Sequence, residues 1–283
     1  MQNFLEEFYN FAKENNINVY RCAAVKGDGE PEAIKINGGN PCQNSYSAAK
    51  AFVVTAIGLL YDEGVLKTDE YICDILAEYC PENMSPLWRK ITVDMALRHH
   101  LGLPGGFLDI DTHDANTFGF DYLGHALSYP IKEPDEFVYT DAAFYILGRV
   151  AAAKAGKPLM AYLWEKLFFP LECREVAWSC CPQGYIMGAT GLYIRTIDMV
   201  KLGAVYLNNG TYKGKRILSE EWVKIVRERP YLRPISENNT AYGHGGMRGQ
   251  KLIIIPESNC AVAWHGWLSD GLTDFVLDYF KNH

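Results

Sequence analysis

The chain lacks a long apolar run: runs such as Leu252 to Ile255 are far shorter than the roughly 20 residues needed to cross a bilayer. It also lacks a secretory signal. The first residues, MQNFLEEFYNFAKENN, are acidic and amphipathic, whereas a signal begins with basic residues followed by a continuous apolar stretch. These absences argue against a membrane partner and predict a cytoplasmic protein.

Basic residues are the minority among the charges: 27 Lys and Arg stand against 34 Asp and Glu, which gives a net charge of −7. An acidic surface repels phosphate backbones, so we expect no nucleic-acid partner. The metal-binding patterns Cys-x-x-Cys and His-Glu-x-x-His are missing as well, so we expect no metal. In a long, unexported chain, the eight cysteines are expected to be reduced thiols.

What the chain has is the length and composition of an ordinary globular protein: 283 residues, of which 48% are apolar and 22% charged. Strand patterns lie towards both ends and helical patterns between them. We expect helices at 1–16, 47–63, 140–155, 158–167, 196–208, 219–226 and 273–281, and strands at 18–25, 33–37, 252–255 and 261–264. This order predicts one sheet built from both chain ends, with a helical lobe inserted between them.

The first group of residues suited to chemistry is Ser47-Ala48-Ala49-Lys50, where a loop enters the helix expected at 47–63. Residues three apart lie on one helix face, so the Ser47 hydroxyl and the Lys50 amine can meet. The positive end of the helix dipole favours an alkoxide, and burial favours a neutral amine that accepts a proton. The alternative is chance, because a chain of this length contains about one Ser-x-x-Lys at ordinary usage.

The second group is Tyr139-Thr140-Asp141. A phenol serves as an acid or base when a nearby cation favours its ionised form, and the carboxylate could orient Lys50 or an amide of the substrate. The alternative interpretation is structural, with Thr140 or Asp141 as the N-cap of the helix expected at 140–155.

The third group is the glycine-rich segment from Tyr242 to Gln250, just before the strand expected at 252–255. Glycines let a ligand approach a strand edge, whose N–H groups can hold a substrate or an oxyanion. Arg248 could bind a substrate carboxylate. A plain glycine loop and a solvated surface arginine are the alternatives.

In this order, the three groups resemble the Ser-x-x-Lys, Tyr-x-Asn and Lys-Thr-Gly motifs of the penicillin-recognising serine hydrolases. The third appears here as His244-Gly245-Gly246, a form similar to that of the class C β-lactamase-related esterases and peptidases. Flanking segments match too: 91–104 resembles the family's I-T-V-x-x-L-L-T-H-T-S-G-L-P, and 191–198 its G-L-x-S-T-A-x-D. The resemblance covers about residues 40–265.

The resemblance implies the α+β, β-lactamase/transpeptidase-like fold, in which an antiparallel sheet built from both chain ends is flanked by helices, as a single catalytic domain over 1–283. It implies a sheet lobe of about 1–45 and 185–283, a helical lobe of about 46–184, and a site between them that needs no cofactor. The residues that it implies for this site are, as catalytic groups, Ser47, Lys50 and Tyr139; as oxyanion-hole donors, the backbone N–H groups of Ser47 and Met247; and as substrate-binding groups, Asp141, His244, Gly246 and Arg248.

Two departures from the family's motifs bear on the substrate. Asp141 replaces an amide with an anion, which disfavours the carboxylate of β-lactams, and His244 replaces a lysine, which weakens the positive charge at neutral pH. We therefore expect a serine hydrolase that cleaves a small-molecule ester, amide or peptide through an acyl-enzyme. A β-lactamase or D-alanyl carboxypeptidase is one alternative, and a catalytically silent sensor or binding module is another.

Overall fold

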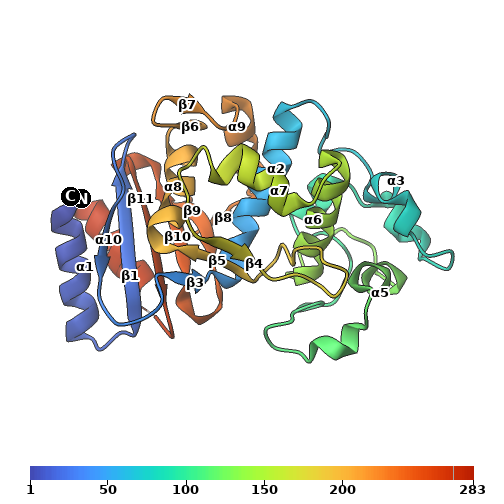
Figure 1. Ribbon diagram of the computed structural model, residues 1–283, viewed down its shortest axis with the longest axis horizontal. Coiled ribbons are helices and arrows are strands. Elements are labelled where there is room, and N and C mark those ends of the chain that lie inside the picture. The colour runs from blue at the N-terminus through green and yellow to red at the C-terminus, as the bar shows by residue number, and fades with distance from the viewer. Residues whose placement is uncertain (270) are drawn as a thin grey trace. The chain divides into compact units, whose positions relative to one another are not determined.

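The computed structural model describes residues 1–269 and 271–283, and the chain forms two compact units (Figure 1). The first unit consists of Met1–Phe52, Lys166–Ala177 and Leu192–His283, and the second of Val53–Glu165 and Trp178–Gly191. Helices and antiparallel sheets are both present, which confirms the α+β class. That the two units act as a single catalytic domain, with the lobe boundaries expected above, stays a prediction.

A six-stranded sheet is the main sheet of the first unit, in the order β2-β1-β11-β10-β9-β8. Its strands are β1 (Val19–Lys26), β2 (Glu32–Lys35), β8 (Arg233–Pro234), β9 (Tyr242–Gly245), β10 (Lys251–Ile255) and β11 (Cys260–Gly266). The neighbouring strands pair antiparallel. Because β1 and β11 are neighbours, segments from opposite ends of the chain lie side by side (Figure 1), and the expected sheet built from both ends is confirmed.

Helices cover both faces of this sheet. α1 (Gln2–Glu14) and α10 (Leu272–Asn282) share one apolar cluster with Val262 and Trp264 of β11. α8 (Thr196–Leu207) packs on β1, β10 and β11, where its Gly203 faces Ala261. Successive residues of a strand point to opposite faces, so the two helical layers lie on opposite sides of the sheet.

Smaller elements complete the first unit. A three-stranded sheet has the order β3 (Cys42–Asn44), β5 (Leu192–Arg195) and β4 (Val176–Trp178), and β6 (Thr211–Tyr212) pairs with β7 (Lys215–Arg216). α9 (Glu220–Glu228) begins after Ser219, whose Oγ accepts a hydrogen bond from the Trp222 N–H at 3.0 Å, as expected for an N-cap. The strands outside the main sheet were not expected, because runs of two to four residues are too short to show alternation.

The second unit is helical. Its elements are α3 (Ile72–Ile75), α4 (Val93–Leu97), α5 (Tyr122–Ser128), α6 (Asp141–Ala155) and α7 (Leu159–Leu163), three 3₁₀ turns at Ala77–Tyr79, Pro86–Lys90 and Ala115–Phe118, and most of α2 (Lys50–Asp62). Every residue of α6 from Asp141 to Ala152 is buried. No helix in the two described ranges of the chain has the length and apolar character to span a membrane.

Two of the expected helices differ from the observed ones. The helix expected at 47–63 begins later, because Tyr46–Ala49 forms a 3₁₀ turn and α2 starts at Lys50. The helix expected at 158–167 consists of α7 followed by a π-helical turn at Trp164–Phe168. Apolar periodicity predicts both segments as helical but does not distinguish a 3₁₀ or π turn from an α turn.

Two helical glycines form a matched test of how α8 packs on the sheet. A Cβ at Gly203 would lie 2.7 Å from the Ala261 Cβ, whereas a Cβ at Gly148 in α6 would have no atom nearer than 3.8 Å. Alanine gains up to about 1 kcal/mol of helix propensity, but overpacking costs about 1–3 kcal/mol. We expect urea unfolding to show a lower free energy of unfolding for Gly203→Ala and an equal or higher one for Gly148→Ala. Equal destabilisation of both would contradict this packing.

Candidate active site

Ser47 and Lys50 meet at the start of α2, as the three-residue spacing predicts. The Lys50 Nζ donates a hydrogen bond to the Ser47 Oγ at 3.1 Å. Lys50 is fully buried, and Ser47 is half-buried in the 3₁₀ turn Tyr46–Ala49 that precedes α2. A hydroxyl that is within reach of reagents and bonded to a buried amine is the arrangement that an activated serine nucleophile requires.

The backbone just before Ser47 makes a sharp turn. Tyr46 has a φ of 46°, in the left-handed region that residues with a Cβ seldom adopt. Two hydrogen bonds hold the turn: the Asn44 Oδ1 accepts from the Tyr46 N–H at 2.9 Å, and the Ser45 N–H donates to the Leu192 carbonyl of β5 at 2.8 Å. These bonds offset the cost of the left-handed residue, which is on the order of 1–3 kcal/mol.

A buried histidine ties the same turn to the main sheet and to α8. The His265 Nε2 is 3.1 Å from the Ser45 Oγ, and its Nδ1 is 2.8 Å from the Thr196 Oγ1. Complete burial lowers the pKa of His265 to about 3, so the ring is neutral and one nitrogen donates while the other accepts. Sequence analysis missed this residue, because a lone histidine inside an apolar strand carries no distinguishing pattern.

The glycine-rich segment also reaches this turn. A Cβ at Gly246 would overlap the Ser45 carbonyl oxygen, so only a glycine lets the end of β9 approach so closely. β9 packs on the 3₁₀ turn that holds Ser47. The first and third predicted groups are therefore neighbours within the first unit. Met247 follows directly, as the first residue of a 3₁₀ turn to Gly249.

His244 carries no positive charge at neutral pH. Its side chain is buried in β9, and its Nδ1 lies 2.9 Å from the Gly245 carbonyl oxygen. Burial, followed by the nearby Lys50 ammonium, lowers the pKa of His244 to about 3. A neutral ring does not provide the positive charge that a substrate carboxylate would need. The sequence predicted a weaker positive charge at this position, and the structure shows none on His244.

Arg248 has a different environment. It is exposed, its φ of 65° is left-handed, and its guanidinium lies over the half-exposed Trp267 ring at 4.6 Å from the centroid. Stacking on an aromatic face leaves the guanidinium edge able to donate hydrogen bonds. The proposed carboxylate-binding role of Arg248 stays a prediction.

In the second unit, the Tyr139 ring stacks on the His99 ring, with centroids 4.6 Å apart and planes at 29°. Thr140 is the N-cap residue of α6, but its Oγ1 donates to the Phe107 carbonyl at 2.8 Å and makes no side-chain cap. Thr140 therefore occupies the N-cap position, as the structural alternative expects, but its side chain does not cap the helix. Tyr139 itself is half-buried.

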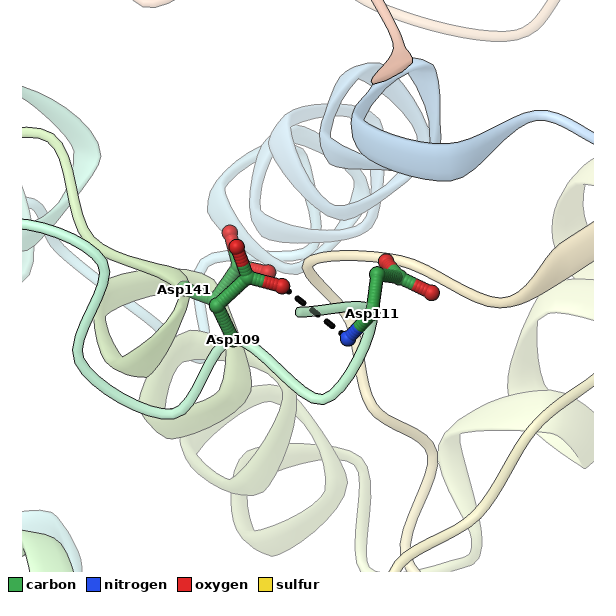
Figure 2. A group of neighbouring side chains, drawn as sticks. All are labelled: Asp109, Asp111 and Asp141. Atoms are coloured by element: carbon green, nitrogen blue, oxygen red, sulfur yellow. Dashed lines mark hydrogen bonds between the residues drawn. The ribbon is translucent and has the colours of Figure 1, made fainter. Parts of the chain in front are cut away.

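Three carboxylates cluster at the start of α6. One side-chain oxygen from each of Asp109, Asp111 and Asp141 lies within 4.8 Å of the other two. Figure 2 shows Asp109 and Asp111 on one loop, joined by the Asp111 N–H bond to the Asp109 Oδ1 at 3.0 Å, and Asp141 on the helix beside them. The Thr190 Oγ1 donates to the Asp111 carboxylate.

This cluster has oxygen ligands alone, which suit a hard cation such as Ca²⁺ or Mg²⁺, or an ammonium group. Exposed acidic groups are common without a cation, and the cluster alone assigns none. Sequence analysis identified Asp141 and missed Asp109 and Asp111. The only signal was the pair of aspartates in a loop, and their approach to Asp141 depends on tertiary structure.

Comparison with known proteins places the chain in a family. The model of the Beta-lactamase family matches residues 42–266, so this chain belongs to that family. The curated N-acetylmuramyl-L-alanine amidase of Bacillus subtilis (strain 168) is 22% identical over 245 residues, which cover 62% of this chain and 55% of the amidase. The chain therefore spans about half the length of this curated relative.

Solved structures share the fold. The octameric penicillin-binding protein homologue from Pyrococcus abyssi aligns with a TM-score of 0.74 and 17% identity, over 98% of this chain and 77% of its own. A family VIII carboxylesterase aligns with a TM-score of 0.73 and 17% identity, over 95% of this chain and 92% of its own. The β-lactamase/transpeptidase-like fold implied by the sequence motifs is thus confirmed.

The two buried histidines predict a loss of stability in mild acid. The folded pKa of both His244 and His265 is about 3, against about 6.5 in an unfolded chain. Below pH 6.5 the unfolded chain therefore binds protons that the folded protein does not. The free energy of unfolding should fall by up to about 1.4 kcal/mol per pH unit for each histidine.

Urea unfolding from pH 7 to pH 5 measures this slope. His244→Asn and His265→Asn should each flatten it by up to about 1.4 kcal/mol per pH unit, and the double variant should flatten it further. Slopes that match the unmodified protein in all three variants would show that these rings titrate normally in the folded state.

Proposed function

We propose that this protein is a serine hydrolase that cleaves an ester or amide of a small acyl substrate through an acyl-enzyme on Ser47. The observation that carries the proposal is the hydrogen bond from the Lys50 Nζ to the Ser47 Oγ, at 3.1 Å, at the entrance of α2. The family's members include hydrolases of esters and amides by name, the carboxylesterase and the amidase among them. This family membership supports hydrolysis over a role in binding alone.

The reaction has two steps. Lys50 first loses its ammonium proton to solvent, and the Ser47 Oγ then attacks the substrate carbonyl carbon while its proton passes to the free Lys50 amine. The bond to the alcohol or amine breaks, and the leaving group takes the proton from the Lys50 ammonium. Water then attacks the acyl-Ser47 ester, one proton returns to the Ser47 Oγ, and the carboxylic acid leaves. No oxidant, reductant or cofactor is consumed.

The remaining predicted groups complete the proposal. Tyr139 is proposed to share the proton transfer with Lys50. The backbone N–H groups of Ser47 and Met247 are proposed as the oxyanion hole, where one donor contributes about 3–4 kcal/mol in comparable enzymes. The approach of Gly246 to the Ser45 carbonyl supports the pairing of these two N–H groups. That the protein works in the cytoplasm stays a prediction.

Charge supports a substrate without a carboxylate near the site. The neutral His244 provides no cation. From the motif alone, Asp141 is proposed to add an anion at the position where the family carries an amide. At 4 Å, two like charges in a partly wet site repel by up to about 4 kcal/mol. We therefore propose uncharged or amine-bearing esters and amides as substrates ahead of β-lactams and D-alanyl peptides.

The nucleophile is tested by labelling and substitution. A fluorophosphonate adduct should map to Ser47 by mass spectrometry, with Ser45, two residues away, as the internal comparison. Ser47→Ala should lower kcat for p-nitrophenyl acetate by several orders of magnitude. The melting temperature should stay close to that of the unmodified protein, because the half-exposed Ser47 buries little apolar surface. An adduct on another serine would refute the assignment.

The role of Asp141 is tested by making it neutral. Asp141→Asn keeps the side-chain size and removes the anion, so it should raise kcat/KM for nitrocefin relative to p-nitrophenyl acetate, by up to about a thousandfold. Both rates are measured side by side in both proteins, with a D-Ala-D-Ala peptide as a third substrate. Efficient nitrocefin or peptide hydrolysis by the unmodified protein would favour the β-lactamase or carboxypeptidase alternative. If the unmodified protein cleaves none of the three substrates, the alternative of a catalytically silent sensor or binding module is favoured.

A further inference from the structure

Arg149 is a buried cation in the second unit. It lies in α6, eight residues after Asp141 and so about 12 Å along the helix from the acidic cluster. Only 3% of the residue is exposed, and no carboxylate among residues 1–269 and 271–283 forms an ion pair with it. A guanidinium cannot lose its charge at neutral pH, so its burial is costly unless something compensates it.

Tyrosines provide part of the compensation. The Arg149 guanidinium carbon lies over the Tyr185 ring at 3.5 Å from the centroid and over the Tyr79 ring at 4.7 Å. One of its nitrogens donates to the Tyr145 hydroxyl at 3.3 Å. A hydrogen bond with Tyr79 is also the main cause that raises the pKa of Tyr185, so these two rings are linked.

The contacts leave the edge of the guanidinium largely unused. A guanidinium has five N–H donors in one plane, and the single hydrogen bond to Tyr145 uses one of them. The contacts with Tyr79 and Tyr185 are cation–π contacts and not hydrogen bonds. The edge is the part that binds a carboxylate through two parallel hydrogen bonds.

A cavity lies beside Arg149. Its volume is about 410 Å³, within the range of small-molecule pockets, and Arg149 lines it. Its other walls are mainly apolar, with Ala152, Leu159 and Ile186 among them. Lys157 stands at the same cavity, but it is exposed and paired with Glu165 at 2.8 Å. The cavity therefore combines one desolvated cation with an apolar interior.

We infer that this cavity is a second ligand site, which binds a small carboxylate with an apolar body and holds the carboxylate on the edge of Arg149. The buried cation supplies the charge complement, and the apolar walls take the hydrocarbon part. Inorganic phosphate has the negative charge but no apolar body, and an uncharged amide has the apolar body but no charge. Both should therefore bind more weakly than the carboxylate. The site is built from the second unit alone and does not depend on the activity proposed for Ser47.

Calorimetric titration of the full chain with sodium hexanoate tests the site, with hexanamide and inorganic phosphate as comparison ligands. Arg149→Gln should weaken hexanoate binding at least tenfold. Because this buried change risks misfolding, a second pair acts at the exposed cavity residue Ala153. Ala153→Glu should weaken hexanoate binding at least tenfold by repulsion, and the neutral Ala153→Gln of similar size should change it less than threefold.

Ser47→Ala distinguishes this site from the catalytic one and should retain the hexanoate affinity of the unmodified protein. Affinity that is lost in Ser47→Ala but unchanged in Arg149→Gln and Ala153→Glu would overturn the inference. It would also be overturned by hexanamide or phosphate binding as tightly as hexanoate, or by the absence of hexanoate binding up to tens of millimolar. Failure of Ser47 to react with a fluorophosphonate would refute the hydrolase proposal and leave this test intact.

Discussion

The antiparallel pairing of β1 with β11 is the constraint on which the first unit depends. It joins strands from the two ends of the chain, in continuous register from Arg21 and His265 to Lys26 and Cys260. β11 then carries His265 to the Ser45 hydroxyl, 220 positions away in sequence, and to Thr196 at the start of α8. The turn that carries Ser47 is therefore held by the sheet and by a helix packed on it, which is the preorganisation that the proposed nucleophile would require.

Two histidines near this turn are neutral, because burial lowers the pKa of each. His265 can accept from one hydroxyl and donate to another only while it is neutral, and burial keeps it so. His244 is neutral for the same reason, with the Lys50 ammonium as a second cause. Charge near Ser47 thus comes from lysine rather than histidine. The stability of the unit in mild acid and the charge beside Ser47 both depend on the burial of these rings.

The sequence predicted the side-chain contacts that depend on the local geometry of the chain. The spacing of Ser47 and Lys50 predicts their contact, because a helical turn is enough to bring them together. The Ser45–His265 bond and the cluster of Asp109 with Asp141 could not be predicted, since each joins segments that only tertiary folding brings together. The resemblance to a family predicted the fold. It did not identify Arg149 as a candidate functional residue, because the aromatic partners of Arg149 come from separate segments of the second unit.

α6 contains two buried charged residues, and stability alone does not explain them. Twelve consecutive residues of the helix are buried, and two of them, Asp141 and Arg149, carry formal charge. Replacing buried charges by apolar residues of similar size is often neutral or stabilising, so neither residue is explained by stability alone. They do not neutralise each other, because about two turns of helix separate them. Each is therefore oriented towards its own surroundings: Asp141 towards two further carboxylates, and Arg149 towards tyrosine rings and an apolar cavity. One helix thus carries two buried groups of opposite charge, each in surroundings of its own.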